Sequence, residues 1–174
     1  AAGPLCKTVS DFEGLAETPI AAIMMGSMTW EARLGNRGDT YYSDRASLSL
    51  NALGLPNGGH PYYRKHLRGM VEGAAQKGKT LWMSVAGFTP QEYADLTLLA
   101  FEHGADLVEL NLGCPNVWQG GAQKEIAALN PALTKEILQT VKQAIEEKIN
   151  PDHPISLAVK VSPYLPDLLP RNPN

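Results

Sequence analysis

The sequence predicts an α/β protein built on a parallel sheet. Short apolar runs, typical of buried strands, alternate with longer segments whose apolar residues recur at helical spacing. Helix start signals stand between these runs, as Asn130 and Pro131 do at the head of one segment. Strands separated by helices form βα units and pair in parallel, so a doubly wound sheet and a (β/α)₈ barrel both fit the pattern.

The first expected elements are a helix, a strand and a long loop. Ser10 is a candidate N-cap for a short helix over residues 11–17, which Pro19 would end. The apolar residues 20–25 predict a buried strand. Residues 26–59, rich in Gly, Asn, Asp and Ser, predict a long functional loop with short strands near 40–42 and 47–50.

The middle of the chain predicts helix, strand and helix. Pro61 suits the first turn of a helix that reaches residue 76, and Gly78 suits its C-terminal end. Residues 81–85 are an apolar run and predict a second strand. The next helix begins with the residues of a capping box and stops at Gly104; its N-cap, N1 and N3 positions are Thr89, Pro90 and Glu92.

The last third predicts a strand over residues 107–112 and a loop over 113–123. An amphipathic helix follows over 130–148, and residues 155–161 are a fourth apolar run. The proline-rich tail from Ser162 is expected to be irregular.

Composition excludes several classes of protein. Fifteen Lys and Arg against eighteen Asp and Glu give a net charge of −3, which is not a strongly basic nucleic-acid footprint. No apolar run approaches the roughly 18 residues of a membrane span, and the N-terminal residues do not resemble a signal peptide. Two isolated cysteines argue for reduced thiols in a cytoplasmic protein. The four histidines show no metal-ligand spacing, so no metal site is expected.

The candidate site follows from the rule that active sites of both architectures lie at the carboxyl ends of the strands. There, residues 111–116 (NLGCPN) place side-chain amides on both sides of the Cys114 thiol. Amides can bind the edge of a planar ligand, and a thiol can accept a proton. The alternative is that Cys114 is a buried structural thiol. Residues 51–57 (NALGLPN), taken alone, fit a polar turn.

Together, these segments resemble the dihydroorotate dehydrogenase family, and its soluble class 1 members most closely. The family pattern N-x-x-G-L-P-N corresponds to residues 51–57, and N-L-S-C-P-N corresponds to residues 111–116, with Gly113 in place of Ser. Residues 1–6, 84–87 and 159–164 are similar to its first, third and fifth strand ends. These matches occur in family order over nearly the whole chain.

The resemblance implies a single FMN-binding (β/α)₈ TIM-barrel domain over residues 1–174, covering about the first five strands. It implies oxidation of dihydroorotate to orotate in pyrimidine biosynthesis, with hydride transfer to FMN and Cys114 as the general base. The substrate-binding residues carried over are Asn51, Asn111 and Asn116. The cofactor-binding residues are Ala2, Gly3, Ser27 and Lys160, with Lys160 beside the isoalloxazine.

Three departures from the family pattern stand out. Gly26 precedes Ser27 where the family usually has a Lys that contacts flavin and substrate; Arg33 is a candidate substitute. Residues 118–121 replace the usual loop after the cysteine motif. A complete barrel needs about 250 residues, so the C-terminal half is expected from a longer chain or a partner chain.

Two other functions fit parts of the pattern. The tRNA-dihydrouridine synthases share an N-x-G-C-P pattern, which Gly113 matches, but the acidic balance and residues 51–57 argue against them. A non-catalytic binding or scaffold protein would explain Gly26. The resemblance also implies a homodimer without nucleic-acid or membrane partners, and leaves fumarate or NAD open as electron acceptor.

Overall fold

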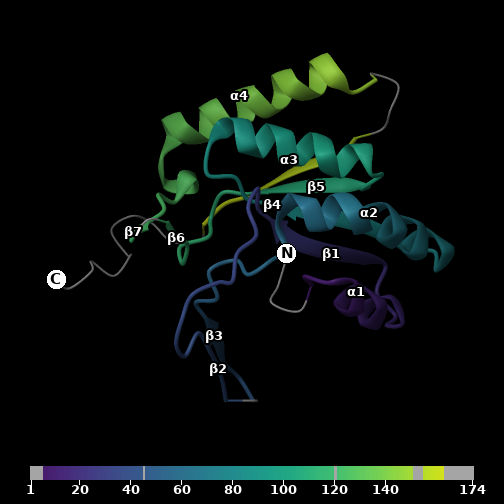
Figure 1. Cartoon of the computed structure of the whole chain (residues 1–174), viewed down its shortest axis with the longest axis horizontal. Coiled ribbons are helices and arrows are strands. Elements are labelled where there is room, and N and C mark those ends of the chain that lie inside the picture. The colour runs from purple at the N-terminus through teal and green to yellow at the C-terminus, as the bar shows by residue number, and fades with distance from the viewer. Residues whose placement is uncertain (1–5, 45, 120, 151–154, 163–174) are drawn as a thin grey trace.

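The computed structural model describes residues 6–44, 46–119, 121–150 and 155–162 (Figure 1). Its main sheet has four strands in the order β1-β4-β5-β8, and all neighbouring strands pair in parallel. The order in space follows the order along the chain and never reverses. A doubly wound sheet reverses its strand order, whereas a (β/α)₈ barrel adds each strand beside the last. The topology therefore fits the barrel.

The elements follow the predicted alternation. The main strands are β1 (Ala22–Met28), β4 (Thr80–Val85), β5 (Leu107–Asn111) and β8 (Leu157–Lys160). The helices are α1 (Val9–Ala16), α2 (Gly59–Gln76), α3 (Pro90–Glu102) and α4 (Pro131–Lys148), with a 3₁₀ turn η1 (Ala127–Leu129) before α4. Two small hairpins leave the sheet: β2 (Tyr41–Ser43) with β3 (Ser49–Asn51), and β6 (Trp118–Gln119) with β7 (Ala122–Gln123).

The capping residues explain where the helices begin. Thr89 and Asn130 cap α3 and α4 as predicted, each with Pro in the first turn, but the predicted capping box of α3 is incomplete because Glu92 Oε2 accepts from the Phe88 amide and not from Thr89. The prediction of Ser10 as the first cap is wrong. Thr8 caps α1 instead, because the Thr8 hydroxyl accepts from the Asp11 amide while the Asp11 carboxylate accepts from the Thr8 amide.

The predicted strand at residues 20–25 is shifted in the structure. It begins at Ala22 and continues to Met28, where it pairs with Val85 of β4. Gly26 and Ser27, expected after the strand, are part of it: they form an irregularity in the pairing with β4, which resumes at Met28.

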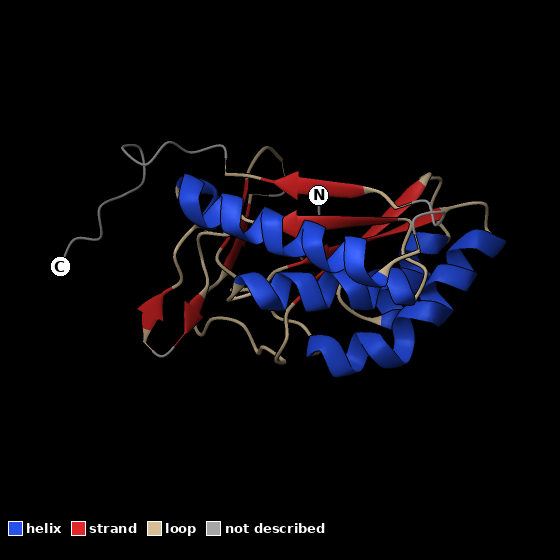
Figure 2. Ribbon diagram, turned by 90° about the horizontal axis from the view of Figure 1, so that it is seen from above, coloured by secondary structure: helices blue, strands red, loops and turns tan. Residues whose placement is uncertain are grey.

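The two faces of the sheet differ in chemistry because strand side chains alternate. One face carries buried apolar side chains, including Met25, Met83 and Leu110, which share a core with α2 and α3. The helices lie together on that side of the sheet (Figure 2). The other face carries polar side chains at paired positions: Ser84 opposite Glu109, and Asn111 opposite Lys160.

The long loop after β1 is fixed by one buried side chain. Asn57 Oδ1 accepts from the amides of Thr29 and Gly59, while Asn57 Nδ2 donates to Thr29 Oγ1 and to the Leu55 carbonyl. Both polar atoms of the Asn57 side chain, Oδ1 and Nδ2, therefore form their hydrogen bonds within residues 29–59. Asn57 is therefore a structural residue that holds residues 51–57 against the carboxyl end of β1.

Candidate functional site

A pocket of about 220 Å³ opens at the carboxyl edge of the parallel sheet. It is lined by Lys7, Ser27, Asn51, Leu53, Gly54, Leu55, Pro56, Asn111, Gly113, Cys114, Asn116 and Lys160. Six predicted site residues are among them: Ser27, Asn51, Asn111, Cys114, Asn116 and Lys160. The two others, Ala2 and Gly3, lie outside the described residues. The structure thus gathers around one pocket predicted residues that are up to 133 positions apart, from Ser27 to Lys160.

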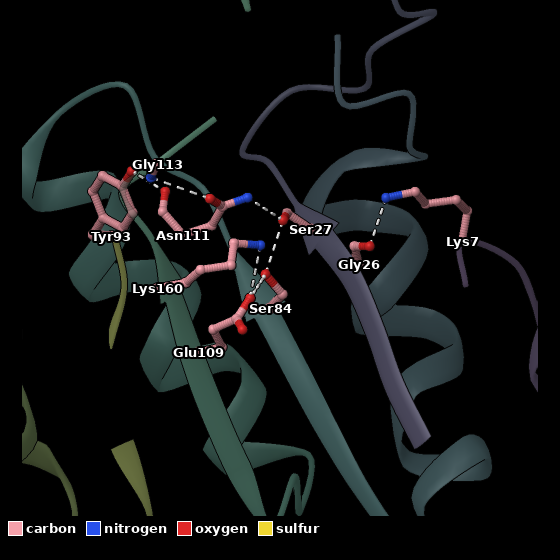
Figure 3. Close-up of polar contacts among 9 residues, drawn as sticks. All are labelled: Lys7, Gly26, Ser27, Ser84, Tyr93, Glu109, Asn111, Gly113 and Lys160. Atoms are coloured by element: carbon pink, nitrogen blue, oxygen red, sulfur yellow. Dashed lines mark hydrogen bonds and ion pairs between the residues drawn. The ribbon is translucent and has the colours of Figure 1, made fainter. Parts of the chain in front are cut away.

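A chain of hydrogen bonds crosses the polar face of the sheet beneath this pocket (Figure 3). Asn111 Nδ2 donates to Ser27 Oγ at 2.9 Å, Ser27 Oγ lies 2.8 Å from Ser84 Oγ, and Ser84 Oγ donates to Glu109 Oε1 at 2.9 Å. Because each hydroxyl has one proton, Ser27 must donate to Ser84 when Ser84 donates to the carboxylate. The chain runs in one direction and ends on Glu109.

Glu109 also holds Lys160. The Glu109 carboxylate is buried, and its Oε1 lies 3.1 Å from Lys160 Nζ. This ion pair gives the Lys160 ammonium a fixed place at the pocket, whereas a lysine on an open surface would extend its ammonium into solvent. The sequence analysis assigns no role to Glu109, but residues two apart on a strand share a face, and the structure places Glu109 on the same face as Asn111.

The motif asparagines have different duties. Asn111 is buried; its Oδ1 accepts from the Gly113 amide at 3.4 Å and its backbone carbonyl accepts from the Tyr93 hydroxyl at 2.8 Å. Asn116 Nδ2 donates to the Asn51 carbonyl at 3.2 Å. Asn36 Nδ2 reaches both loops, with bonds to the carbonyls of Ala52 and Asn116. The two predicted motif loops are therefore tied to each other beside the pocket.

Cys114 is half-buried and lines the main pocket and a smaller hollow behind it. Lys124 lines that hollow too, with its Nζ 5.6 Å from the ring centre of Phe88 and 5.8 Å from that of Tyr93. Burial lowers the pKa of Lys124, and the nearby Cys114 partly offsets this. Reactive cysteines occur in partly exposed, electropositive surroundings, and Cys114 has both properties.

Arg33 does not take the place of the missing lysine. Its Nε donates to the Gly54 carbonyl at 3.1 Å and its Nη2 to the Trp118 carbonyl at 2.9 Å, and its guanidinium carbon lies 5.1 Å from the centre of the Phe88 ring. It is not among the pocket-lining residues. Arg33 instead joins the loop at residues 51–57 to the β6–β7 hairpin, so the matching loop and the altered one are both bonded to the same side chain.

Lys7 was missed by the sequence analysis. It precedes α1, lines the pocket, and donates from Nζ to the Gly26 carbonyl at 2.5 Å. Burial lowers the pKa of Lys7, and repulsion from Lys160 adds to this, while Cys6, Cys114 and Asp11 oppose it. No local motif marks Lys7, because its role depends on contact with a strand that lies 19 positions later.

Two glycines of the site are explained by close approaches. Gly26 has φ +96°, and a Cβ atom there would lie 2.5 Å from the Ser84 carbonyl oxygen. A Cβ atom at Gly113 would lie 2.8 Å from the Ser162 amide nitrogen and the Val161 carbonyl carbon. Neither position accepts a side chain without backbone movement, so both departures from the family pattern have a steric reason here.

The donor set fits one edge of a flavin ring or a pyrimidine. An ammonium from Lys160, a hydroxyl from Ser27 and amides from three asparagines converge on the pocket. Its volume is below the roughly 300–1,000 Å³ of typical small-molecule sites, so the described residues can enclose a single ring or one end of a larger ligand. The part of the chain that the structure describes contains no cluster of three His, Cys, Asp or Glu side chains that could hold a metal ion. Nor does it contain a helix long and apolar enough to cross a membrane.

Comparison with known proteins shows the family of the chain. A family model described as dihydroorotate dehydrogenase matches residues 1–170. Dihydroorotate dehydrogenase (fumarate) of Lachancea kluyveri is 33% identical over 168 residues, which cover 94% of this chain and 48% of that protein. Dihydroorotate dehydrogenase A (fumarate) of Lactococcus lactis subsp. cremoris is 36% identical over 118 residues, which cover 67% of this chain and 37% of that protein. The chain thus spans less than half the length of these relatives.

Proposed function

Because the chain belongs to the dihydroorotate dehydrogenase family, a family of TIM-barrel oxidoreductases, we propose that the protein containing it oxidises dihydroorotate to orotate with FMN. The observation that carries this proposal is the convergence of Cys114, three asparagines and Lys160 on one pocket at the carboxyl edge of the sheet. Barrel enzymes place their reacting groups at that edge. The four strands of the main sheet, β1, β4, β5 and β8, correspond to the second to fifth strands of the barrel.

In the proposed reaction, the pocket supplies a base, Cys114, and a positive charge, Lys160. Cys114, as the thiolate, takes the C5 proton of dihydroorotate and becomes the thiol; its partly exposed side chain lines the pocket. When bound, FMN supplies the acceptor for the hydride that leaves C6. Lys160, fixed by Glu109, presents a positive charge to the flavin ring, and Ser27 presents its hydroxyl.

The asparagines orient the substrate. A side-chain amide offers both a donor and an acceptor, as the imide and amide edges of a pyrimidine require. Asn51 and Asn116 come from loops that are bonded to each other, so a ligand that contacts both is held in one orientation. The buried Asn111 forms the floor, where its own hydrogen bonds keep it fixed.

The wider setting is part of the same proposal. The reaction belongs to pyrimidine biosynthesis in the cytoplasm, in a homodimer without nucleic-acid or membrane partners. Fumarate is the favoured electron acceptor, since the relatives named above carry it in their names. The remaining barrel strands come from residues beyond this chain or from a partner chain.

The test is anaerobic reduction of the full-length protein that contains this chain. We expect a purified protein with the visible spectrum of a bound flavin, which bleaches on addition of dihydroorotate. Dihydrouracil, which lacks the carboxylate, serves as the comparison substrate and should bleach it far more slowly. A flavin that bleaches with neither would contradict the proposed substrate, and a colourless protein would favour a non-catalytic binding role.

A further inference from the structure

Lys7 is held in place from both sides by the end of β1. Lys7 Nζ donates to the Gly26 carbonyl, and the Gly26 amide donates to the Cys6 carbonyl at 2.8 Å. Figure 3 shows the Lys7 side chain extending toward Gly26. Two hydrogen bonds of opposite direction therefore dock residues 6 and 7 on the strand end that borders the pocket.

The backbone of Lys7 is equally constrained. Its amide donates to Asp11 Oδ2 at 2.8 Å as part of the start of α1, and its carbonyl accepts from the Tyr63 hydroxyl at 3.1 Å. Tyr63 is fully buried in the core. Because both backbone groups are bonded, the direction of the side chain follows from the fold and not from a free surface rotamer.

The charges around the pocket do not balance. Two ammonium groups, those of Lys7 and Lys160, line it. Glu109 neutralises Lys160 at 3.1 Å, whereas within the described residues Lys7 forms no ion pair with a carboxylate. A half-buried ammonium without a carboxylate partner is costly. The pocket therefore has one excess positive charge and favours a ligand that brings one negative charge.

We propose that Lys7 is a substrate-binding residue, whose ammonium pairs with the carboxylate of the ligand. This inference rests on the proposed function and adds a residue from a different segment of the chain. Gly26, on the neighbouring strand end, cannot supply a side chain, because a Cβ atom there would collide with the Ser84 carbonyl and lie 2.8 Å from the Met28 amide. Lys7 reaches over that glycine and brings a cation to the same edge of the pocket.

The test compares two ligands that differ in the carboxylate. The dissociation constants of orotate and of uracil are measured by equilibrium dialysis on the full-length holoprotein, for the wild type and for Lys7→Met. We expect orotate binding to weaken about 10–100-fold, the usual range for one charge-assisted hydrogen bond, and uracil binding to stay within about twofold. Lys7→Arg should retain most of the orotate affinity. Lys65→Met, which removes an exposed lysine of α2, should leave both constants unchanged.

Each outcome decides the matter. Unchanged orotate binding in Lys7→Met would overturn the proposal, and an equal loss for orotate and uracil would reduce Lys7 to a structural residue. Thermal melting and flavin content of each variant show whether it has folded, and Lys7→Arg provides the comparison if Lys7→Met has not. A wild-type protein that binds uracil but not orotate would refute the proposed function, and the role of Lys7 with it.

Discussion

At the scale of single residues, Glu109 connects most of the site. It accepts the last hydrogen bond of the chain from Asn111 through Ser27 and Ser84, and it holds Lys160. The carboxylate is buried, so its negative charge needs compensation. Ser84 donates a hydrogen bond to Oε1, and Lys160 places a positive charge beside it. The positions of Asn111 and Lys160 at the pocket thus depend on Glu109, which does not line the pocket itself.

Replacing Glu109 with Gln tests this dependence. The amide can still accept from Ser84, but it leaves the Lys160 ammonium without its counter-charge. We expect a loss of about 1–3 kcal/mol in the free energy of unfolding, measured by urea denaturation. Glu146→Gln is the matched control, because its pair with Lys142 is 3.6 Å long and exposed; a loss below about 0.5 kcal/mol is expected there. Equal losses in the two variants would contradict the account.

Gly113 marks the closest approach between the cysteine loop and the end of β8. In Gly113→Ser, the family residue would place its Cβ atom 2.8 Å from the Ser162 amide nitrogen. The backbone must move, at a cost of about 1–3 kcal/mol typical of overpacked sites. We expect a lower melting temperature and faster alkylation of Cys114, measured with iodoacetamide, because the loop that holds the thiol is displaced. A variant with wild-type melting and alkylation would show that the two segments are farther apart.

At the scale of elements, the start of α1 is coupled to the pocket. Although burial opposes it, hydrogen bonds from the amides of Lys7 and Thr8 lower the pKa of Asp11 below its usual 3.8. The same carboxylate fixes the backbone of Lys7, whose side chain lines the pocket. An acidic residue in the first turn is also favoured by the helix dipole. The N-terminal cap therefore contributes to the position of a binding residue.

Asp11→Asn removes the charge and keeps a side chain of the same size. Because the folded pKa is depressed, the ionised Asp11 stabilises the fold fully above pH 3.8, and this is lost as the pH falls through the folded pKa. At neutral pH we expect the variant to be less stable by about 0.3–1 kcal/mol. The difference in melting temperature from the wild type should shrink below pH 3.8. A difference that grows in acid would contradict this assignment.

Sequence patterns predicted the elements well where the signals are local. Asn130 and Pro131 located the start of α4, and the apolar runs located β4 and β5, because caps and periodicity act over a few residues. The prediction of Ser10 as the first cap failed because Thr8 is also a good N-cap residue, and the hydrogen bonds with Asp11 that make it the cap form only in the folded chain. The extension of β1 to Met28 depends on its partner β4 and has no signal of its own.

The sequence predicted only part of the site, again because it carries local signals and not long-range contacts. Six pocket residues belong to motif segments or strand ends and could be named from the sequence. Glu109 could have been found from its position two residues before Asn111, which puts both on one face of β5. Lys7 and Lys124 could not, because their places in the site come from contacts with β1 and with the rings of α3 and its preceding loop.

At the scale of the whole molecule, β8 forms one edge of the four-stranded main sheet. Leu157 and Val159 of β8 pair with Val108 and Leu110, so they lie on the apolar face that the helices cover, yet they remain 40% and 41% exposed. In a barrel, a following strand pairs with β8 and the inner face closes. The chain covers less than half the length of its relatives, and we propose that the pocket on the opposite, polar face is one wall of a larger cavity in the whole protein.

In the proposed reaction, Cys114 removes the substrate proton in this pocket. The measurement is the rate at which dihydroorotate bleaches the flavin of the full-length protein without oxygen, in stopped flow, for Cys114→Ser and for Cys6→Ser. We expect Cys114→Ser to be slower by about 10²–10⁴-fold, the usual contribution of a general base, because a serine hydroxyl ionises far less readily than a thiol and so offers no anion to take the proton. Cys6→Ser, which changes the other cysteine of the chain, should bleach at the wild-type rate. Bleaching of Cys114→Ser at the wild-type rate would show that another group takes the proton.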